Sequence, residues 1–493
     1  MIPRLSQQQQ HRQRRTSPAS SQLTTSLCEQ TSLPQQAVKD PPHYFQRLEV
    51  QRNSRCCLRL VVFLLFMTLL SFVAASWTGA RKQVFGTVKH QQSLQSSSMS
   101  SAAFSSEQDS IHRETALRRA LWGFFAGDAV AAPTHWFYGG RTQIQQYYGP
   151  KGITKYTKPV YELAGSIMNK SDLNGGGRSK GGSSANDLPT IIGQVINHGK
   201  QDLWSPKRQI HYHATLQAGE NTLEVQLARV LMKSMVANQG RFKAEHFRQA
   251  YMDFMMTPNS HNDAYASTCH RMFFANLIHR KLPPDQCPDN DGHNVDTVDG
   301  LVLPTIVSLA YAVQNDNNND ANDASNNQDH LAAAQQAAVE CVRVTRNSPV
   351  LEQATKAWSS MIYQVMRQPH QALPEAATTV AQTLGLRTPR GDQSDEITAC
   401  YLGQALPALL DSVVKYGGRN EKDSVWKALL ANANTGGENV HRGSCLGAVL
   451  GAAATSSDGQ AEWNANEDPM VQGLHDKEQL EKEIDDFVRA VLR

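Results

Sequence analysis

Two short polar clusters contain the residues best suited to chemistry in this chain of 493 residues. The first is Gly219-Glu220-Asn221-Thr222, and the second is Gly436-Gly437-Glu438-Asn439. Each precedes an apolar pattern of helical spacing, so it sets carboxylate and amide oxygens beside the unpaired backbone N–H groups of a helix start. Helix starts of this kind bind phosphate and metal–phosphate groups. Either cluster alone is equally well explained as a helix cap, but two similar clusters favour one shared site.

The helix expected after the second cluster has a glycine at every fourth position, namely Gly443, Gly447 and Gly451. Because glycine has no side chain, a neighbouring helix can approach such a surface very closely. We therefore expect this helix to pack tightly against its neighbours.

Helical periodicity extends over most of the region 112–493, whereas alternating β-branched runs are scarce. The sequence therefore predicts an all-α fold, a compact many-helix domain whose glycine-containing connections converge on one pocket. Thr115 is expected to cap the first helix, which Pro133 ends. The other expected helices span about 220–237, 244–256, 265–280, 301–313, 330–345, 351–367, 374–384, 397–416, 422–432, 443–454 and 476–492.

The N-terminal part of the chain has a different composition. Residues 1–55 are rich in Gln, Ser and Arg and poor in apolar side chains, which predicts a disordered tail. Residues 58–77 are the expected transmembrane signal-anchor, because the uncharged stretch 60–77 reaches the length of about 17 to 25 helical residues that a bilayer needs. The Gln/Ser-rich stretch 78–111 is expected to be a flexible linker.

Slightly more basic residues precede the apolar segment than follow it, which predicts a cytosolic N-terminus and a C-terminal domain across the membrane. The alternative is a cleaved signal, because the small residues Ala74-Ala75-Ser76 resemble a signal-peptidase site. Cleavage would release a secreted or organelle-lumenal domain.

Composition excludes several function classes. The net charge of +3 includes no basic cluster in the expected domain, which argues against nucleic acid as the main partner. The five cysteines of the domain include no C-x-x-C pair, so neither a zinc site of that type nor a disulfide framework is indicated. A transporter or receptor is disfavoured because the sequence has only one apolar span.

Several ordered blocks of the sequence resemble the ADP-ribosylglycohydrolase (DraG-like) family, which includes the J1 crystallins. The segment ALWGFFAGDAVAAP at 120–133 is similar to the family's opening signature. The resemblance covers about residues 112–455 and indicates a subgroup with GENT and GGEN in place of the usual Asp motifs. The other blocks are HATLQAGENTLEVQLARVL at 213–231, HNDAYASTCHRMFFANL at 261–277, HNVDTVDGLVLP at 293–304 and LLANANTGGENVHRGSCLGAVLGAA at 429–453.

The resemblance implies an all-α enzyme that holds a pair of magnesium ions in a central cleft and cleaves the bond between ADP-ribose and an acceptor. The usual ligands come from a T-D-D-T and a D-T-D-T motif. Here Glu220 and Glu438 keep two of the four carboxylates, while Asn221 and Val440 replace the others. Because magnesium needs oxygen ligands, we expect one ion rather than two.

The resemblance also implies roles for particular residues. Glu220, Asn221, Thr222 and Glu438 are the expected metal ligands, and Glu220 and Glu438 are the candidate catalytic carboxylates. The expected substrate-binding residues are Asp128, Gly436, Gly437, Asn439 and His441.

Other polar residues have a structural explanation that is at least as good. His441 stands out among the histidines because it lies within one turn of Glu438. Asp296 and Asp299 are either a second carboxylate pair or the capped start of a helix. The remaining histidines of note, expected to be hydrogen-bonded structural residues, are His211, His213, His261, His270 and His293.

Two function classes follow from the sequence. The first is a hydrolase acting on an ADP-ribosylated substrate or an ADP-ribose derivative, with magnesium. The alternative is a catalytically inactive relative that keeps the fold as a binding or structural protein, as in the crystallin branch. The oxygen-bearing replacements Glu and Asn favour the hydrolase, since random decay would more often introduce apolar residues.

Overall fold

The computed structural model describes residues 95–175, 188–290, 295–314, 324–367, 373–417, 423–454 and 463–493. All of them belong to one compact unit, Thr87–Arg493. The expected tail 1–55 and membrane segment 58–77 lie outside the described residues. None of the helices in the described part of the chain is both long and apolar enough to cross a membrane.

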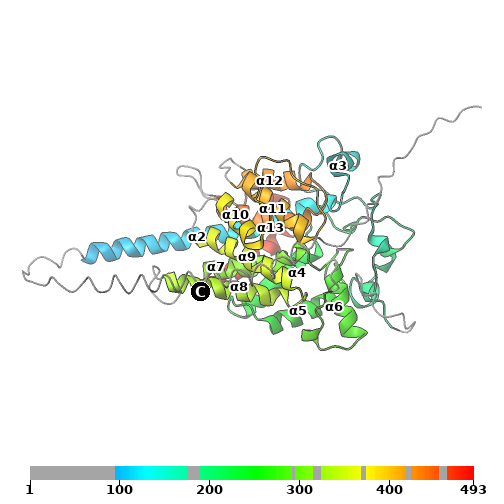
Figure 1. Ribbon diagram of the computed structural model, residues 1–493, viewed down its shortest axis with the longest axis horizontal. Coiled ribbons are helices and arrows are strands. Elements are labelled where there is room, and N and C mark those ends of the chain that lie inside the picture. The colour runs from blue at the N-terminus through cyan, green and yellow to red at the C-terminus, as the bar shows by residue number, and fades with distance from the viewer. Residues whose placement is uncertain are drawn as a thin grey trace, which may run out of the picture. The chain divides into compact units, whose positions relative to one another are not determined.

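The predicted all-α fold is confirmed, since the described residues form helices and only isolated β-bridges (Figure 1). The α-helices are α2 (Gln95–Ala131), α3 (Gly140–Tyr148), α4 (Leu223–Ala237), α5 (Ala244–Met256), α6 (Thr268–Ile278), α7 (Val302–Val313), α8 (Ala324–Val342), α9 (Pro349–Arg367), α10 (Leu373–Leu384), α11 (Leu402–Tyr416), α12 (Ser424–Ala433), α13 (Val440–Ala453), α14 (Pro469–Gln472) and α15 (Lys477–Val491).

The first helix differs from the sequence-based expectation. It begins at Gln95, inside the expected linker 78–111, so Thr115 lies within α2 instead of capping it. Two helices, α3 and α14, are absent from the expected set. In α3 only Gly140 and Ile144 are buried, and α14 has four residues, so neither has an apolar stripe that periodicity could detect.

The centre of the fold is the contact between α2 and α13, which is the most extensive contact between any two described helices. A side chain at Gly123 would collide with the carbonyl oxygen of Gly447, and one at Gly127 would collide with that of Gly443. The two backbones therefore touch directly through pairs of glycines. This contact confirms the predicted tight packing of the glycine-spaced helix. The same contact brings the end of α2 next to the start of α13.

Other helices surround this pair. In Figure 1, α11 and α12 lie near α13, while α7, α8 and α9 form a neighbouring group. On another side α4 packs against α5, α7 and α15. The connections that precede α4 and α13 carry the two polar clusters singled out in the sequence.

Candidate functional site

Glu438 lies immediately before α13 and its side chain is completely buried. Its Oε1 receives a hydrogen bond from Nδ1 of His441 at 2.6 Å, and its Oε2 receives one from Nε1 of Trp136 at 3.0 Å. Nε2 of His135 lies 3.2 Å from Oε2. Three ring nitrogens from two segments of the chain therefore surround one carboxylate.

Burial and charge act in opposite directions on these groups. Burial works to raise the pKa of Glu438, but the neighbouring His441 and His135 hold this pKa well below its usual range. Burial works to lower the pKa of His441, yet the Glu438 carboxylate raises it to about 10. For His135 burial is the larger effect and lowers its pKa to about 4. Glu438 is thus ionised and His441 cationic, while His135 is neutral.

The backbone fixes Glu438 through the two preceding glycines. Gly436 and Gly437 have φ values of +77° and +63°, a conformation that glycine adopts at little cost. The turn docks on the segment that follows α2, because Gly437 accepts from the N–H of Trp136 at 2.8 Å and donates to the carbonyl of Phe137 at 3.2 Å. The N–H of Gly437 is therefore used within the fold.

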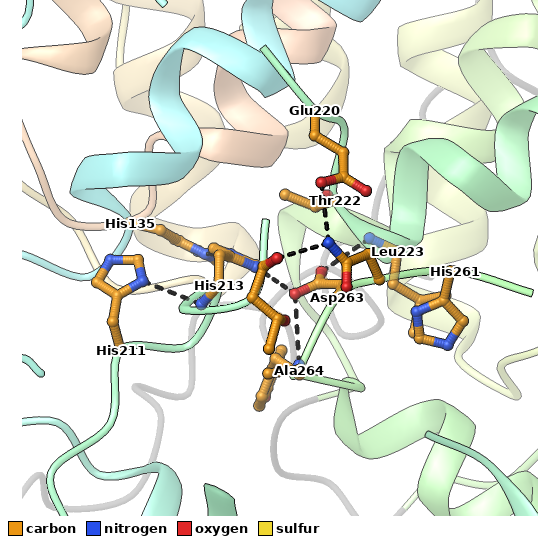
Figure 2. A network of polar contacts seen from close by, with 12 residues as sticks. His135, His211, His213, Glu220, Thr222, Leu223, His261, Asp263 and Ala264 are labelled. Atoms are coloured by element: carbon orange, nitrogen blue, oxygen red, sulfur yellow. Dashed lines mark hydrogen bonds and ion pairs between the residues drawn. The ribbon is translucent and has the colours of Figure 1, made fainter. Parts of the chain in front are cut away.

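A chain of buried polar contacts extends from Glu438 to Asp263. Figure 2 shows its members His135, His213 and Asp263. Nδ1 of His135 lies 2.7 Å from Nε2 of His213, and Nδ1 of His213 lies 2.8 Å from Oδ1 of Asp263. Oδ2 of Asp263 accepts from the backbone N–H of Leu223 at 2.9 Å, at the start of α4. Burial opposes ionisation of Asp263, but these partners keep its pKa below the usual value.

Asn221 and Thr222 are directed at Asp128 of α2. Thr222 donates its backbone N–H to Oδ2 of Asp128 at 2.8 Å and its hydroxyl to Oδ1 at 2.6 Å. Nδ2 of Asn221 donates to the same carboxylate at 2.9 Å. Burial raises the pKa of Asp128, although these hydrogen bonds oppose the rise. The expected substrate-binding residue Asp128 thus joins two expected metal ligands into one buried cluster.

Glu220 lies apart from this cluster. Figure 2 shows it on the loop before α4, and its Oε2 accepts from Gln217 N at 2.7 Å and from Asn262 Nδ2 at 3.1 Å. It lines an open pocket of about 780 Å³ together with residues that include Lys200 and His261. Its hydrogen-bond partners in the described part of the chain do not include Glu438 or any residue bonded to Glu438. The two glutamates expected to share a metal are therefore not brought into contact.

The structure adds a buried ionic group that the sequence did not indicate. Oε1 of Glu224 lies 2.9 Å from Nε2 of His270 and 3.7 Å from Nη2 of Arg346. The same guanidinium nitrogen of Arg346 lies 2.5 Å from Oδ2 of Asp299. Asp299 is therefore paired with arginine. The charges of Asp299 and Glu224 also help to raise the pKa of His441, so this group lies within electrostatic reach of the candidate site.

Aromatic side chains lie beside the carboxylate. Trp136 has a φ of +59°, an uncommon backbone conformation for a bulky residue. Its ring lies 4.2 Å from that of His135 and makes edge contacts with Tyr212 at 4.2 Å and Tyr265 at 5.1 Å. Tyr265 stacks on Trp204 at 5.6 Å. This strained tryptophan links Glu438 to an aromatic group of the kind that can contact a nucleobase or sugar.

Sequence reasoning missed several of these residues. His135 and Trp136 closely follow the block that ends at Pro133, and Asp263 lies within the block 261–277. The only signal for them was their place in or beside the blocks that resemble the family. Of the noted histidines, His213 belongs to the buried chain and His270 to the ionic group, while His293 lies outside the described residues.

Two sets of three buried side chains in the described part of the chain have ligand atoms close enough to share a metal ion. One is His135, Glu438 and His441, and the other is Glu224, Cys269 and His270. In each set the ligand atoms all lie within 4.8 Å of one another. Both sets contain nitrogen or sulfur donors.

Comparisons with known proteins identify the family. The family model for ADP-ribosylglycohydrolase matches residues 109–491, so the chain belongs to the ADP-ribosylglycohydrolase family. A solved structure described as "ADP-ribosylglycohydrolase-related protein complex" is 15% identical, with a TM-score of 0.44, and the match covers 77% of this chain and 99% of that chain. No match was found among curated proteins.

Membership of this enzyme family confirms the resemblance that the sequence indicated. The family implies an ADP-ribosyl substrate and typically depends on a metal, and the described residues include buried groups that can bind one. The subgroup defined by the GENT and GGEN motifs stays a prediction.

Proposed function

We propose that this chain hydrolyses the glycosidic bond between ADP-ribose and an acceptor group at the buried site around Glu438. The observation that carries the proposal is a fully buried, ionised carboxylate held between His135, Trp136 and His441 at the start of α13. A carboxylate in such a water-poor environment acts strongly on positive charge that develops nearby.

The proposed reaction breaks the bond between the anomeric carbon and the acceptor and forms a bond from that carbon to the oxygen of a water molecule. Positive charge develops on the sugar ring in the transition state. The negative charge of Glu438 stabilises this state, and its carboxylate takes one proton of the attacking water. The acceptor leaves with a proton, and free ADP-ribose is the other product.

The other buried residues are assigned to positioning. Asp263, through His213, orients the imidazole of His135 against Glu438. Asp128 clamps Asn221 and Thr222 and so sets the position of α4 relative to α2. Asn439 donates to Thr134 Oγ1 at 2.8 Å and Gly437 donates its N–H to Phe137, which leaves the neighbouring aromatic rings as the proposed substrate contacts.

A single magnesium ion stays a prediction, and the residues around Glu438 fit it poorly. The hydroxyl of Thr222 and the amide nitrogen of Asn221 bond to Asp128, and the carboxylate of Glu220 accepts from Gln217 and Asn262. The donors closest to Glu438 are two imidazoles, whereas magnesium prefers oxygen ligands in octahedral geometry. No step of the proposed reaction is assigned to magnesium.

One observation favours the alternative, an inactive relative that binds ADP-ribose without cleaving it. Both carboxylate oxygens of Glu438 already face nitrogen partners, and Val440 next to it is buried and apolar. A carboxylate so fully engaged is well suited to a structural role.

We also propose, from the sequence alone, that residues 58–77 anchor the chain in a membrane with the C-terminal domain on the far side. Release after signal cleavage is the alternative for the same segment.

The hydrolase proposal is tested with the full-length chain and substrates in which ADP-ribose is attached to arginine, to serine or to a small alcohol. Release of ADP-ribose is followed by chromatography, and binding of ADP-ribose by calorimetry. Glu438→Gln should lower the release rate by about 10² or more, while the exposed Glu478→Gln should not change it. Binding of ADP-ribose with no release from any substrate would support the inactive relative instead.

A further inference from the structure

The end of α2 and the start of α13 bring three buried side chains of ligand type together. His135, Glu438 and His441 are each no more than 5% exposed, and their ligand atoms lie within 4.8 Å of one another. We propose that these three residues bind one divalent transition-metal ion of the class that accepts imidazole nitrogen, such as Zn²⁺, Fe²⁺ or Co²⁺. Two histidines and one carboxylate are a common ligand set for this class.

The direction of the hydrogen bonds along the buried chain supports a cation at this point. The carboxylate of Asp263 can only accept hydrogen bonds. Its Oδ2 accepts the backbone N–H of Leu223, and its Oδ1 accepts from Nδ1–H of His213. In the tautomer of His213 with its proton on Nδ1, Nε2 is bare and accepts from Nδ1–H of His135. This assignment leaves Nε2 of His135 without a proton.

The bare Nε2 of His135 therefore points at Oε2 of Glu438, 3.2 Å away. Both atoms present lone pairs, so their approach is unfavourable unless a positive charge lies between or beside them. Without a metal, the proton that His441 donates to Glu438 supplies this positive charge. A bound cation takes the place of that proton and accepts electron pairs from all three ligand atoms.

The spacing of the ligand atoms agrees with a metal site. With metal–ligand distances of about 2.1 Å, neighbouring ligand atoms lie about 3.0–3.4 Å apart. The distance between His135 Nε2 and Glu438 Oε2 falls in this range, and that between His441 Nδ1 and Glu438 Oε1, 2.6 Å, needs to widen by only about 0.5 Å. The two imidazole rings stand at 81° with centroids 5.3 Å apart.

Neighbouring side chains hold the proposed ligands in place by hydrogen bonds, as is usual around bound metals. Ligating histidines usually donate their second ring N–H to another group, which fixes the ring and its tautomer. His135 does so through His213, which is itself held by Asp263. Glu438 receives the indole N–H of Trp136. Three protein ligands also leave coordination positions open for water or substrate.

The second set of ligand-type residues has less need of a cation. Arg346 already lies 3.7 Å from Glu224 and 2.5 Å from Asp299, and His270 is 2.9 Å from Glu224. A metal ion bound there would be repelled by the guanidinium.

The assignment of the ion to His135, Glu438 and His441 does not depend on the proposed hydrolysis, because an inactive relative can bind the same metal.

The test uses the full-length chain, freed of metal with a chelator and then titrated with Zn²⁺, Co²⁺ or Mg²⁺. We expect one equivalent of Zn²⁺ or Co²⁺ by elemental analysis and calorimetry, visible ligand-field bands for bound Co²⁺, and a higher melting temperature. Mg²⁺ at the same concentration should bind at least about 100-fold more weakly.

Variants locate the ion. His135→Gln and His441→Gln should each weaken Co²⁺ binding by about 100-fold or more and change its spectrum, and His213→Gln should weaken it by about 10- to 100-fold. His246→Gln, whose imidazole bonds to Ser234, is the matched control and should bind as the unaltered chain does. Cys269→Ser tests the second set of residues, and this variant should bind Co²⁺ as the unaltered chain does.

Two results overturn the proposal. One is a wild-type chain that binds no Zn²⁺ or Co²⁺, or binds them no better than Mg²⁺. The other is binding that persists in folded His135→Gln and His441→Gln but is lost in Cys269→Ser. Circular dichroism establishes that each variant is folded, and His213→Gln keeps all three ligands if the direct variants do not fold.

Discussion

Thr222 donates two hydrogen bonds to Asp128, one from its backbone N–H at 2.8 Å and one from its hydroxyl at 2.6 Å, so the two carboxylate oxygens are each bound. The residues are far apart in the sequence and join the start of α4 to α2. Because both are buried, the pair is a fixed point of the fold next to the candidate site.

Replacing Thr222 with valine keeps the shape of the side chain but removes the hydroxyl donor. Oδ1 of the buried Asp128 then loses this hydrogen bond, which should lower the free energy of unfolding by about 1–3 kcal/mol. Chemical denaturation measures the change. The control is Thr383→Val, because the hydroxyl of Thr383 bonds only to the preceding helical turn on an exposed surface. Equal stability of the two variants would contradict the assigned role of Thr222.

Glycine pairs in the contact between α2 and α13 lead to a second prediction. Gly447→Ala should destabilise the domain by more than about 3 kcal/mol, because the new methyl group would collide with backbone atoms of Gly123 that cannot move aside. Gly403→Ala in α11 is the matched control, since nothing lies within 4 Å of the added carbon. Alanine is the better helix former, so Gly403→Ala should be neutral or stabilising by up to about 1 kcal/mol. Thermal or urea unfolding compares the two, and a Gly447→Ala domain as stable as the control would refute the close contact.

The contact between these helices was predictable because its signal is local. Gly443, Gly447 and Gly451 are spaced along one helix face, and this pattern indicates a close approach whatever the partner is. The start of α2 was missed for the opposite reason. Residues 95–110 have few apolar side chains, so no periodic pattern precedes Thr115.

The candidate site was predictable only where its residues are close in sequence. Glu438 and His441 are three residues apart at a helix start, so their contact follows from helical geometry. His135 and His213 are 78 residues apart and His213 and Asp263 are 50 apart, and no local pattern links them. Their meeting depends on how α2, α4 and α13 pack together.

Glu220 illustrates the limit of the motif comparison. The chain turns at Gly219, whose φ is +77°, and Glu220 then accepts from the backbone N–H of Gln217. Asn221 and Thr222 point at Asp128, while Glu220 lies beside the pocket near His261. Side chains of one motif therefore point to two different places, which the sequence alone does not reveal.

A third prediction concerns acid stability. Glu483 of α15 is buried, and hydrogen bonds from Arg229 at 2.7 and 3.0 Å attach it to α4. Burial works to raise its pKa, but Arg229 and Gln479 hold it at about 2, below the ordinary value of 4.5. Because the pKa is lowered on folding, the stabilisation is complete above about pH 4.5 and is lost as the pH falls towards 2.

Glu483→Gln should therefore lower the free energy of unfolding by about 2 kcal/mol at pH 7 and flatten its decrease between pH 4.5 and 2. Urea unfolding at a series of pH values measures both effects. Glu478→Gln is the control on the same helix, because Glu478 is exposed, and it should change stability by less than about 0.5 kcal/mol. Parallel pH curves for the Glu483→Gln variant and the unaltered chain would show that the ion pair contributes nothing.

The last prediction tests whether the indole of Trp136 positions Glu438 for the proposed reaction. Trp136→Phe keeps most of the ring contacts with Tyr212 and Tyr265 but removes the N–H that lies 3.0 Å from Oε2 of Glu438. A hydrogen bond to a charged group contributes about 1.5–3 kcal/mol. If this bond acts on the transition state, kcat should fall by about 10- to 100-fold while KM changes by less than about 3-fold.

Trp463→Phe is the matched control, because it removes an indole hydrogen bond of similar length, 2.8 Å, to the carboxylate of Asp468 in another part of the chain. It should leave kcat and KM unchanged even if it costs some stability. Steady-state release of ADP-ribose from the best substrate separates the two constants for both variants. If the indole N–H of Trp136 is purely structural, Trp136→Phe should lower the melting temperature but leave kcat per folded molecule intact, because phenylalanine keeps the backbone N–H that holds the turn at Gly437.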